Sequence, residues 1–267
     1  WENNWALNDT QGFSNASKRY PQTLQEHYRY FWNHDIAVEV ITSEADFSKY
    51  ELIIGPMMYL MTEDVMKRLS SYVKQGGTFV STYITGYVNE NDLTYLGGWP
   101  QPLREMFGIK VTETDTLYPK DRNAVHYADQ FFVAKDYCSL FELEGAEVLG
   151  TYTEDFYAGK PAITRNKYGQ GAAYFIGART NLDFLEYFYG ELAKNKGLEN
   201  AWVIKGDPDV SVQSRDFEDQ SYRFVMNFSE ETKEIQVATA CVDLLTRTTH
   251  PTTLTLAPYE VLLLAEK

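Results

Sequence analysis

The feature that most constrains the fold is a complete strand–helix–strand unit between residues 52 and 83. Residues 52–54 are a short apolar run that predicts a buried strand, and Thr62 is a favourable residue to cap the helix that follows. The apolar stripe of that helix consists of Val65, Met66, Leu69, Tyr72 and Val73. Gly76-Gly77 ends the helix, and Thr78–Tyr83 resumes as a strand. Because a crossover of this kind joins parallel strands, we expect an α/β fold with a doubly wound, mostly parallel sheet.

The rest of the chain up to residue 205 continues this alternation of helices and strands. Apolar residues at spacings of three and four predict a helix over Thr23–Asn33, and a strand is predicted over Ala37–Ile41. Thr85–Pro102 has the Gly, Asn, Asp and Pro content of a long ordered loop. The other predicted elements are a short helix at Leu103–Phe107, strands at Ile109–Thr114, Phe131–Val133 and Val148–Tyr152, a hairpin of Ala162–Arg165 with Ala172–Ile176, and a helix at Leu182–Lys196.

The pattern changes after Gly206-Asp207-Pro208, where short alternating strands follow one another without helices. They are predicted at Val210–Arg215, Tyr222–Asn227, Glu234–Ala238, Leu254–Leu256 and Val261–Ala265. We therefore expect two domains, an α/β domain of residues 1–205 and a small all-β antiparallel domain of residues 206–267.

The charge of the chain argues against several classes of partner. Lys and Arg number 24 against 38 Asp and Glu, which gives a net charge of −14 without a basic block. Nucleic acids and anionic membrane surfaces are bound mainly by clustered basic residues, so neither is an expected partner. No apolar run has the length needed to cross a bilayer.

Cofactor and metal chemistry also lack support in the sequence. Cys138 and Cys241 are far apart and have no zinc-type spacing, and so few cysteines favour a reducing, cytoplasmic location. His27 and His34 are seven residues apart but have no acidic ligand at a suitable spacing, so packed or surface roles are favoured for both. No phosphate-binding glycine motif is present. We expect no cofactor and no metal site.

A catalytic nucleophile would be sought at the strand-to-helix turn Thr82-Tyr83-Ile84-Thr85-Gly86. The sheet resembles that of class I glutamine amidotransferases, in which such a turn carries a cysteine. Here Ile84 occupies that position, so the thiol needed to attack an amide is absent. Sequence-adjacent acidic pairs point to opposite faces of a strand and do not form a glycosidase pair. We nominate no catalytic residue.

Several segments, taken in order, resemble the C-terminal part of the glycoside hydrolase family 42 β-galactosidases. Trp1-Glu2-Asn3-x-Trp5-Ala6-Leu7 resembles the start of that family's trimerisation domain. The long loop supplies Gly86-x-Val88-x-Glu90-Asn91-Asp92, Leu96-Gly97-Gly98-x-Pro100-x-Pro102-Leu103-Arg104 and Phe107-Gly108-Ile109. The later matches are Tyr168-Gly169-x-Gly171-x-Ala173-Tyr174-x-Ile176-Gly177, Asn227-Phe228-Ser229, Asp243-Leu244-Leu245 and Leu256-x-Pro258-Tyr259-x-Val261-Leu262.

This resemblance implies a parent protein that hydrolyses terminal β-D-galactosides by a retaining mechanism. In the family both catalytic glutamates lie in an N-terminal (β/α)₈ barrel, which takes about 250 residues and is not in this sequence. The implied task of this region is to assemble a homotrimer, with its own copies and the barrel of the parent chain as partners. In the family an apolar strand precedes the Trp1-Glu2-Asn3 segment, so we also expect neighbouring strands to be left unpaired or to pair differently.

The long loop and the first segment supply the candidate contact residues. Trp5, Tyr87, Tyr95 and Trp99 are placed at a subunit interface or facing a neighbouring barrel, with core filling as an equal alternative for the tryptophans. Asn91 and Arg104 are candidates to approach substrate in the intact trimer. An alternative function is a free-standing carbohydrate-binding or protein-interaction module, because 20 tyrosines and 5 tryptophans offer sugar-stacking surfaces. An independent hydrolase or amidotransferase is the least supported reading.

Overall fold

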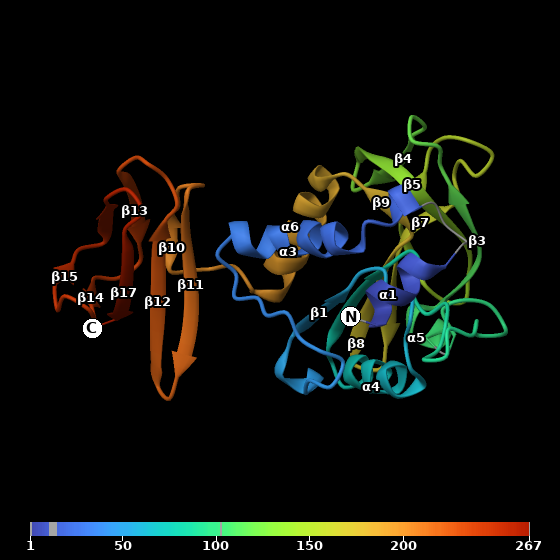
Figure 1. Ribbon diagram of the computed structural model, residues 1–267, viewed down its shortest axis with the longest axis horizontal. Helices are drawn as coiled ribbons and strands as arrows, with labels where there is room; N and C mark the ends of the chain where they lie inside the picture. Colours follow the sequence, from blue (N-terminus) through green and yellow to red (C-terminus); the bar gives the residue numbers. More distant parts are fainter. Residues whose placement is uncertain (1, 11–14, 102, 267) are drawn as a thin grey trace. The chain divides into compact units, whose positions relative to one another are not determined.

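A computed structural model describes residues 2–10, 15–101 and 103–266 (Figure 1). The chain forms two compact units. The first consists of Trp1–His27 with Ile41–Leu185, and the second of Tyr28–Val40 with Glu186–Lys267. The motif positions Trp1 and Pro102 lie outside the described residues.

The predicted crossover is confirmed in the first unit. Strand β1 (Leu52–Gly55) pairs in parallel with β2 (Thr78–Thr82), and helix α4 (Glu63–Lys74) connects them. The Thr62 hydroxyl accepts a hydrogen bond from the Val65 amide, so the helix begins where its cap predicted. Gly76 has φ +120°, a conformation that other residues rarely adopt, and it ends the helix. Helix α4 packs against β2 and against β8 (Gly171–Ile176), which extends the parallel part (Figure 1).

The α/β class is confirmed, but the sheet is mixed rather than mostly parallel. Its order is β1-β2-β8-β7-β6-β4-β5-β3, and only the β1–β2 and β2–β8 pairs among the described strands are parallel. Parallel neighbours need helical crossovers, whereas after Phe107 the chain turns back through hairpins until Leu182. The antiparallel strands are β3 (Ile109–Thr116), β4 (Asn123–Tyr127), β5 (Gln130–Leu143), β6 (Glu147–Tyr152), β7 (Pro161–Tyr168) and β9 (Ala178–Thr180), which pairs with β5.

The strand predicted over Ala37–Ile41 is wrong. This segment lies within the described residues and forms no strand, and Val40 in it is 87% exposed. An extended segment becomes a strand only when a neighbour pairs with its backbone, and β1, at the edge of the sheet, pairs only with β2 among the described strands.

The predicted helices are confirmed with small shifts in their bounds. Helix α6 (Leu182–Lys196) matches its prediction, and α3 (Tyr20–Asn33) begins one turn earlier than predicted. Helix α5 (Arg104–Phe107) ends at Gly108, whose φ is +63°. The elements α1 (Glu2–Asp9), α2 (Asn15–Lys18) and the 3₁₀ turn η1 (Phe47–Lys49) complete the helical set of the described residues.

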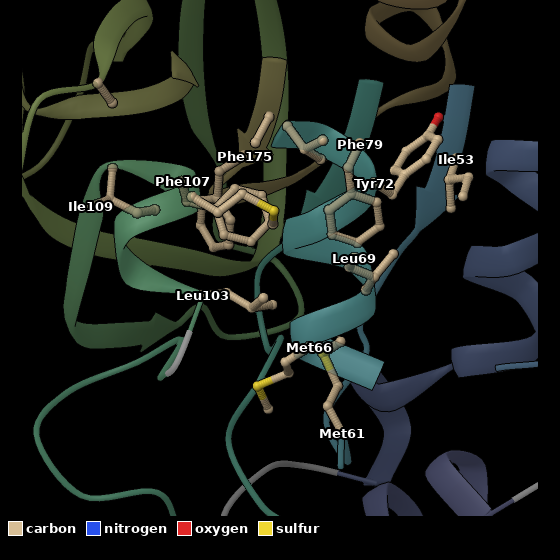
Figure 2. Close-up of a cluster of buried hydrophobic side chains, with 14 of the residues drawn as sticks. Ile53, Met61, Met66, Leu69, Tyr72, Phe79, Leu103, Phe107, Ile109 and Phe175 are labelled. Carbon is tan, nitrogen blue, oxygen red and sulfur yellow. The ribbon is translucent and has the colours of Figure 1, made fainter. Parts of the chain in front are cut away.

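The main core of the first unit lies between α4, α5 and the sheet (Figure 2). Tyr72 and Leu69 of α4 point toward Phe79 of β2, and Phe107 of α5 lies beside Phe175 of β8. The ring centroids of Phe107 and Phe175 are 5.5 Å apart in an edge-on arrangement. Full burial of a phenylalanine side chain contributes about 2–3 kcal/mol, so this aromatic group fixes α4 and α5 on the strands.

Two turns far apart in the sequence meet backbone to backbone at one end of this core. Strands β7 and β8 form the predicted hairpin with a tight turn at Gly169-Gln170, and the Gln170 amide donates to the Lys74 carbonyl at 3.0 Å. A Cβ atom on Gly171 would lie 2.1 Å from the Gly77 carbonyl oxygen. Only glycine fits at position 171, because the neighbour there is backbone that has no room to move.

The strands of the second unit are antiparallel, and the small all-β region is confirmed. One sheet has the order β11-β12-β17-β14-β15 and the other β10-β13-β16. Trp202 and β10 pack and pair with these later strands. The bounds are β10 (Val203–Lys205), β11 (Val210–Phe217), β12 (Gln220–Asn227), β13 (Lys233–Val237), β14 (Cys241–Asp243), β15 (Thr249–His250), β16 (Thr253–Leu256) and β17 (Val261–Glu266).

Candidate functional site

The turn after β2 has the sharp geometry of an elbow but carries a hydrocarbon side chain. Ile84 has φ +55°, a left-handed conformation that a β-branched residue adopts only under constraint. Its side chain is 1% exposed and packs with Leu7, Met57 and Tyr137 in a second core cluster. The position at which a nucleophile would be presented is therefore filled by core packing.

The hydroxyl groups around this elbow are occupied in holding β1 and β2 together. The Thr82 hydroxyl accepts from the Met57 amide at 2.9 Å, and the Thr85 hydroxyl accepts from the Met58 amide at 3.2 Å. Ser81 donates to the Gly55 carbonyl at 2.6 Å. These contacts give the three side chains structural roles, and no base is positioned by them to activate a hydroxyl.

A buried arginine lies behind the elbow and connects it to the N-terminal segment. Arg179 is 3% exposed, and its guanidinium donates to the Tyr83 hydroxyl at 2.8 Å and to the Asp136 carboxylate at 2.9 Å. It also donates to the carbonyls of Ser17 and Lys18 at the end of α2. One cation thus satisfies acceptors from the turn after β2, from β5 and from α2, which fixes the elbow against β5 and α2.

The electrostatics of this cluster keep Arg179 charged and the nearby imidazole neutral. Burial opposes the charge of Arg179, but Tyr83 and Asp136 hold the pKa of its guanidinium above the ordinary value. Burial, assisted by the positive charge of Arg179, lowers the pKa of His27 to about 3. His27 is therefore uncharged at neutral pH and acts as a packed core residue.

Two of the predicted contact residues in the long loop stack on one another. The rings of Tyr87 and Trp99 are parallel, and Tyr87 donates or accepts a hydrogen bond with the Thr114 hydroxyl at 2.7 Å. Tyr87 is 7% exposed, and Trp99 is half-buried against the core clusters. The Tyr95 hydroxyl donates to the Met61 carbonyl at 2.8 Å, and the Tyr95 backbone amide donates to the Tyr87 carbonyl. The structure thus brings these three aromatic residues together as the inner side of the loop.

Arg104 closes the same loop from its far end. Its guanidinium bonds both carboxylate oxygens of Glu144 and the Gly97 carbonyl. The carboxylate of Glu144 raises the pKa of Arg104. A fork-shaped pair of this kind orients the loop strongly, and it occupies donors that a substrate would otherwise use.

Trp5 and Asn91 are not brought into this group. Trp5 lies on α1 and is 63% exposed. Asn91 is exposed in a turn, and its backbone amide donates to the Asn89 side chain. Helix α1 is anchored by Asn3, which donates to the Met57 carbonyl at 3.1 Å and accepts from the Leu60 amide at 2.8 Å. The outer side of the loop also exposes Leu93 and Leu96, at 62% and 90%.

The sequence reasoning did not find Arg179 or its partner Asp136. The available signal was an arginine within the apolar stretch Ile176–Thr180, where a charge is buried only if it is paired. Its partners come from distant parts of the chain, so spacing alone did not reveal them.

Within residues 2–10, 15–101 and 103–266, no group of three or more His, Cys, Asp or Glu side chains is arranged to hold a metal ion. In the same ranges, none of the helices combines the length and apolar character that crossing a membrane requires.

Comparison with known protein families assigns most of the chain to two profiles. The profile described as the β-galactosidase trimerisation domain matches residues 1–199, and that described as the β-galactosidase C-terminal domain matches residues 209–266. Beta-galactosidase GalA of Bacillus licheniformis is 51% identical over 97% of this chain, and GanA of Bacillus subtilis is 51% identical over 98%. The chain spans 39% of the length of each of these two relatives.

Solved structures agree with these sequence matches. Gan42B, a GH42 β-galactosidase from G. stearothermophilus, superposes with a TM-score of 0.94 at 49% identity, over 100% of this chain and 39% of that one. The β-galactosidase from Bacillus circulans sp. alkalophilus has a TM-score of 0.92 at 34% identity, over 100% of this chain and 40% of that one.

Proposed function

The chain belongs to the glycoside hydrolase family 42 β-galactosidases, as their trimerisation and C-terminal region, and from this premise we propose that it assembles the enzyme rather than performing its chemistry. The observation that carries the proposal is the buried Ile84 at the elbow, within a region that matches the trimerisation profile. We infer that the first unit is an amidotransferase-like sheet whose nucleophile position has become core.

The activity of the whole protein is part of this proposal. Relatives that carry the β-galactosidase name are longer, and this chain corresponds to 39% of their length. We propose that the complete protein hydrolyses terminal β-D-galactosides by a retaining mechanism, with both catalytic glutamates in a barrel outside this chain. The chain itself then supplies self-association into a homotrimer and contacts to that barrel.

We propose that the contact surface is the outer side of the long loop together with α1. Exposed Trp5, Leu93 and Leu96 are large apolar side chains of the kind that anchor interfaces. Tyr87, Tyr95 and Trp99 lie on the inner side and give the loop its shape. Arg104 holds the loop through Glu144, and Asn91 is presented at its turn toward the neighbouring subunit or its substrate.

We propose a boundary between an assembly domain and a β domain near residue 205, where Trp202 and β10 lead into the strands that they pack and pair with. The family profiles support this placement by ending at residue 199 and resuming at 209. We also propose a cytoplasmic location, supported by the burial of Cys138 and Cys241 as thiols in different compact units.

Light scattering coupled to size exclusion tests the proposal. One chain has a mass of 30.7 kDa, and the assembly in solution is expected to have about three times that mass. A monomer at every concentration contradicts self-assembly by this region. Trp5→Ala is expected to weaken association about tenfold or more, as loss of an interface anchor does. Phe217→Ala is the matched control, because Phe217 in the second unit is 66% exposed, like Trp5 at 63%. Equal effects of the two substitutions would remove Trp5 from the interface.

A further inference from the structure

The carboxylate of Asp35 reaches the edge of a β-sheet in the second unit. Asp35 follows the last turn of α3, with φ +55°, and its carboxylate accepts a hydrogen bond from the Val212 amide at 2.6 Å. Val212 lies on β11, which forms one edge of its five-stranded sheet. An edge strand has outward amides without a partner strand, and Asp35 satisfies one of them.

The backbone of Asp35 makes a second connection to the same part of the fold. The Asn200 side chain donates to the Asp35 carbonyl at 3.0 Å and accepts from the Trp202 amide at 3.1 Å. Trp202 is 5% exposed in the core of the C-terminal strands. The end of α3 is therefore joined to β11 by the Asp35 carboxylate and to the segment before β10 by the Asp35 carbonyl.

Within the described residues, no lysine or arginine forms an ion pair with Asp35. His34 precedes it and contacts Glu186 of α6, while Tyr30 stacks on the His34 ring at 4.4 Å. Glu199 lies near Tyr30. On the strand side, the neighbours of Val212 are the uncharged Ser211 and Gln213, and Arg223 lies over Trp202.

We propose that Asp35 is a pH-responsive clasp that sets how firmly the C-terminal strands are held to the end of α3. In its ionised form the half-buried carboxylate lies beside one amide and an imidazole, and the partial loss of hydration opposes docking. In its protonated form, the side-chain carboxyl of Asp35 still accepts from the Val212 amide, without the cost of dehydrating a charge. The clasp is tighter in mildly acidic solution and looser at neutral pH.

The direction follows from linkage between protonation and docking. Burial raises the pKa of Asp35 from 3.8 to about 6, against smaller opposing effects of the Val212 amide and His34. A carboxyl whose pKa is raised in the docked state stabilises docking fully below 3.8 and loses that contribution as the pH rises through about 6. The clasp thus responds between about pH 4 and pH 6.5 and changes little above that range.

Hydrogen exchange of the Val212 amide, measured by NMR on the whole chain, tests the clasp. The full shift corresponds to about a tenfold fall in protection between pH 5 and pH 7.5; after correction for intrinsic exchange and allowing for partial exposure of Asp35, we expect a fall of about threefold to tenfold. Asp35→Asn keeps the acceptor and removes the titration, so its protection is expected to stay constant. Asp35→Ala should lose protection at both pH values.

Two further variants test whether an ionisable group other than Asp35 causes the pH response. His34→Gln is expected to keep the pH dependence, and its loss there would assign the response to the imidazole. Asp216→Asn, on the same strand but exposed, is the matched control and should behave as the wild type. A flat wild-type profile, or an Asp35→Asn profile that still falls with pH, overturns the proposal.

Discussion

The indole of Trp99 lies parallel to the ring of Tyr87, with 4.2 Å between the ring centroids and 3° between the planes. This stack joins the end of the long loop to its beginning. The Tyr87 hydroxyl continues the connection to Thr114 on β3. The loop is therefore held from inside by aromatic packing, which leaves its outer apolar residues available for contacts.

Substitutions at the two members of this stack are expected to destabilise the first unit by different amounts. Trp99→Ala should lower the free energy of unfolding by about 2–4 kcal/mol, because a large packed ring is lost. Tyr87→Phe keeps the ring and removes one hydrogen bond, at a cost of about 1 kcal/mol. Urea unfolding measures both, with Tyr118→Phe as control because Tyr118 is 78% exposed. A larger effect of Tyr87→Phe than of Trp99→Ala contradicts this account.

The strained backbone at Ile84 gives a reversed ranking of two substitutions. Ile84→Ala removes buried hydrocarbon and should cost about 2–5 kcal/mol. Ile84→Gly loses the same contacts but relieves the left-handed strain, so it is expected to be about 1 kcal/mol less destabilising than alanine. Ile235, also 1% exposed but in strand β13, is the control, where glycine should be worse than alanine. The same order at both sites would show that the elbow stores no strain.

The buried guanidinium of Arg179 is expected to be essential for the stability of the first unit. Arg179→Met leaves the Asp136 carboxylate and the carbonyls of Ser17 and Lys18 without this donor, at a cost of about 3–5 kcal/mol. Arg179→Lys keeps the charge but not the fork of donors, and should lie between methionine and wild type. Chemical denaturation followed by circular dichroism tests the order. Arg215→Met, at an exposed position, should change stability by less than about 0.5 kcal/mol.

The neutral His27 predicts acid sensitivity of the first unit. Its pKa is about 3 in the folded chain against 6.5 for the free side chain, so the folded state binds fewer protons. The stability it contributes is present above pH 6.5 and is lost as the pH falls toward 3, by about 2 kcal/mol between pH 7 and pH 5. Unfolding at several pH values should show a shallower dependence for His27→Gln than for the wild type. His126→Gln, at a half-buried position, is the control and should retain the wild-type slope.

Local signals in the sequence predicted the elements that need only local information. Thr62, the stripe of α4 and Gly76 fixed one helix and its two ends. The strand at Ala37–Ile41 failed because alternation shows that a segment can be extended, not that another strand pairs with it. Strand β4 was missed because Asn123–Tyr127 mixes polar and apolar residues whose burial depends on β5 and β6.

The sequence predicted where the elbow lies, but not which side chains surround it. The elbow was located at Ile84 from the strand before it and the glycine after it, and the structure has a left-handed residue there. The sequence placed Tyr87 among the contact residues, with core filling as an alternative only for the tryptophans, and the Tyr87 side chain is 7% exposed. The Arg179 cluster was beyond prediction, because its acceptors at Ser17, Tyr83 and Asp136 meet only in three dimensions.

The contact between the two glycine turns makes the pairing of β8 with the crossover depend on a single position, Gly171. The Gly76-Gly77 turn and the Gly169-Gln170 turn are remote in sequence, yet the Lys74 and Gly77 carbonyls accept from amides of the second turn and its strand. A side chain at position 171 would collide with the Gly77 carbonyl, so β8 could not take its place beside β2. Because this docking joins segments remote in the sequence, it adds non-local contacts of the kind that slow folding.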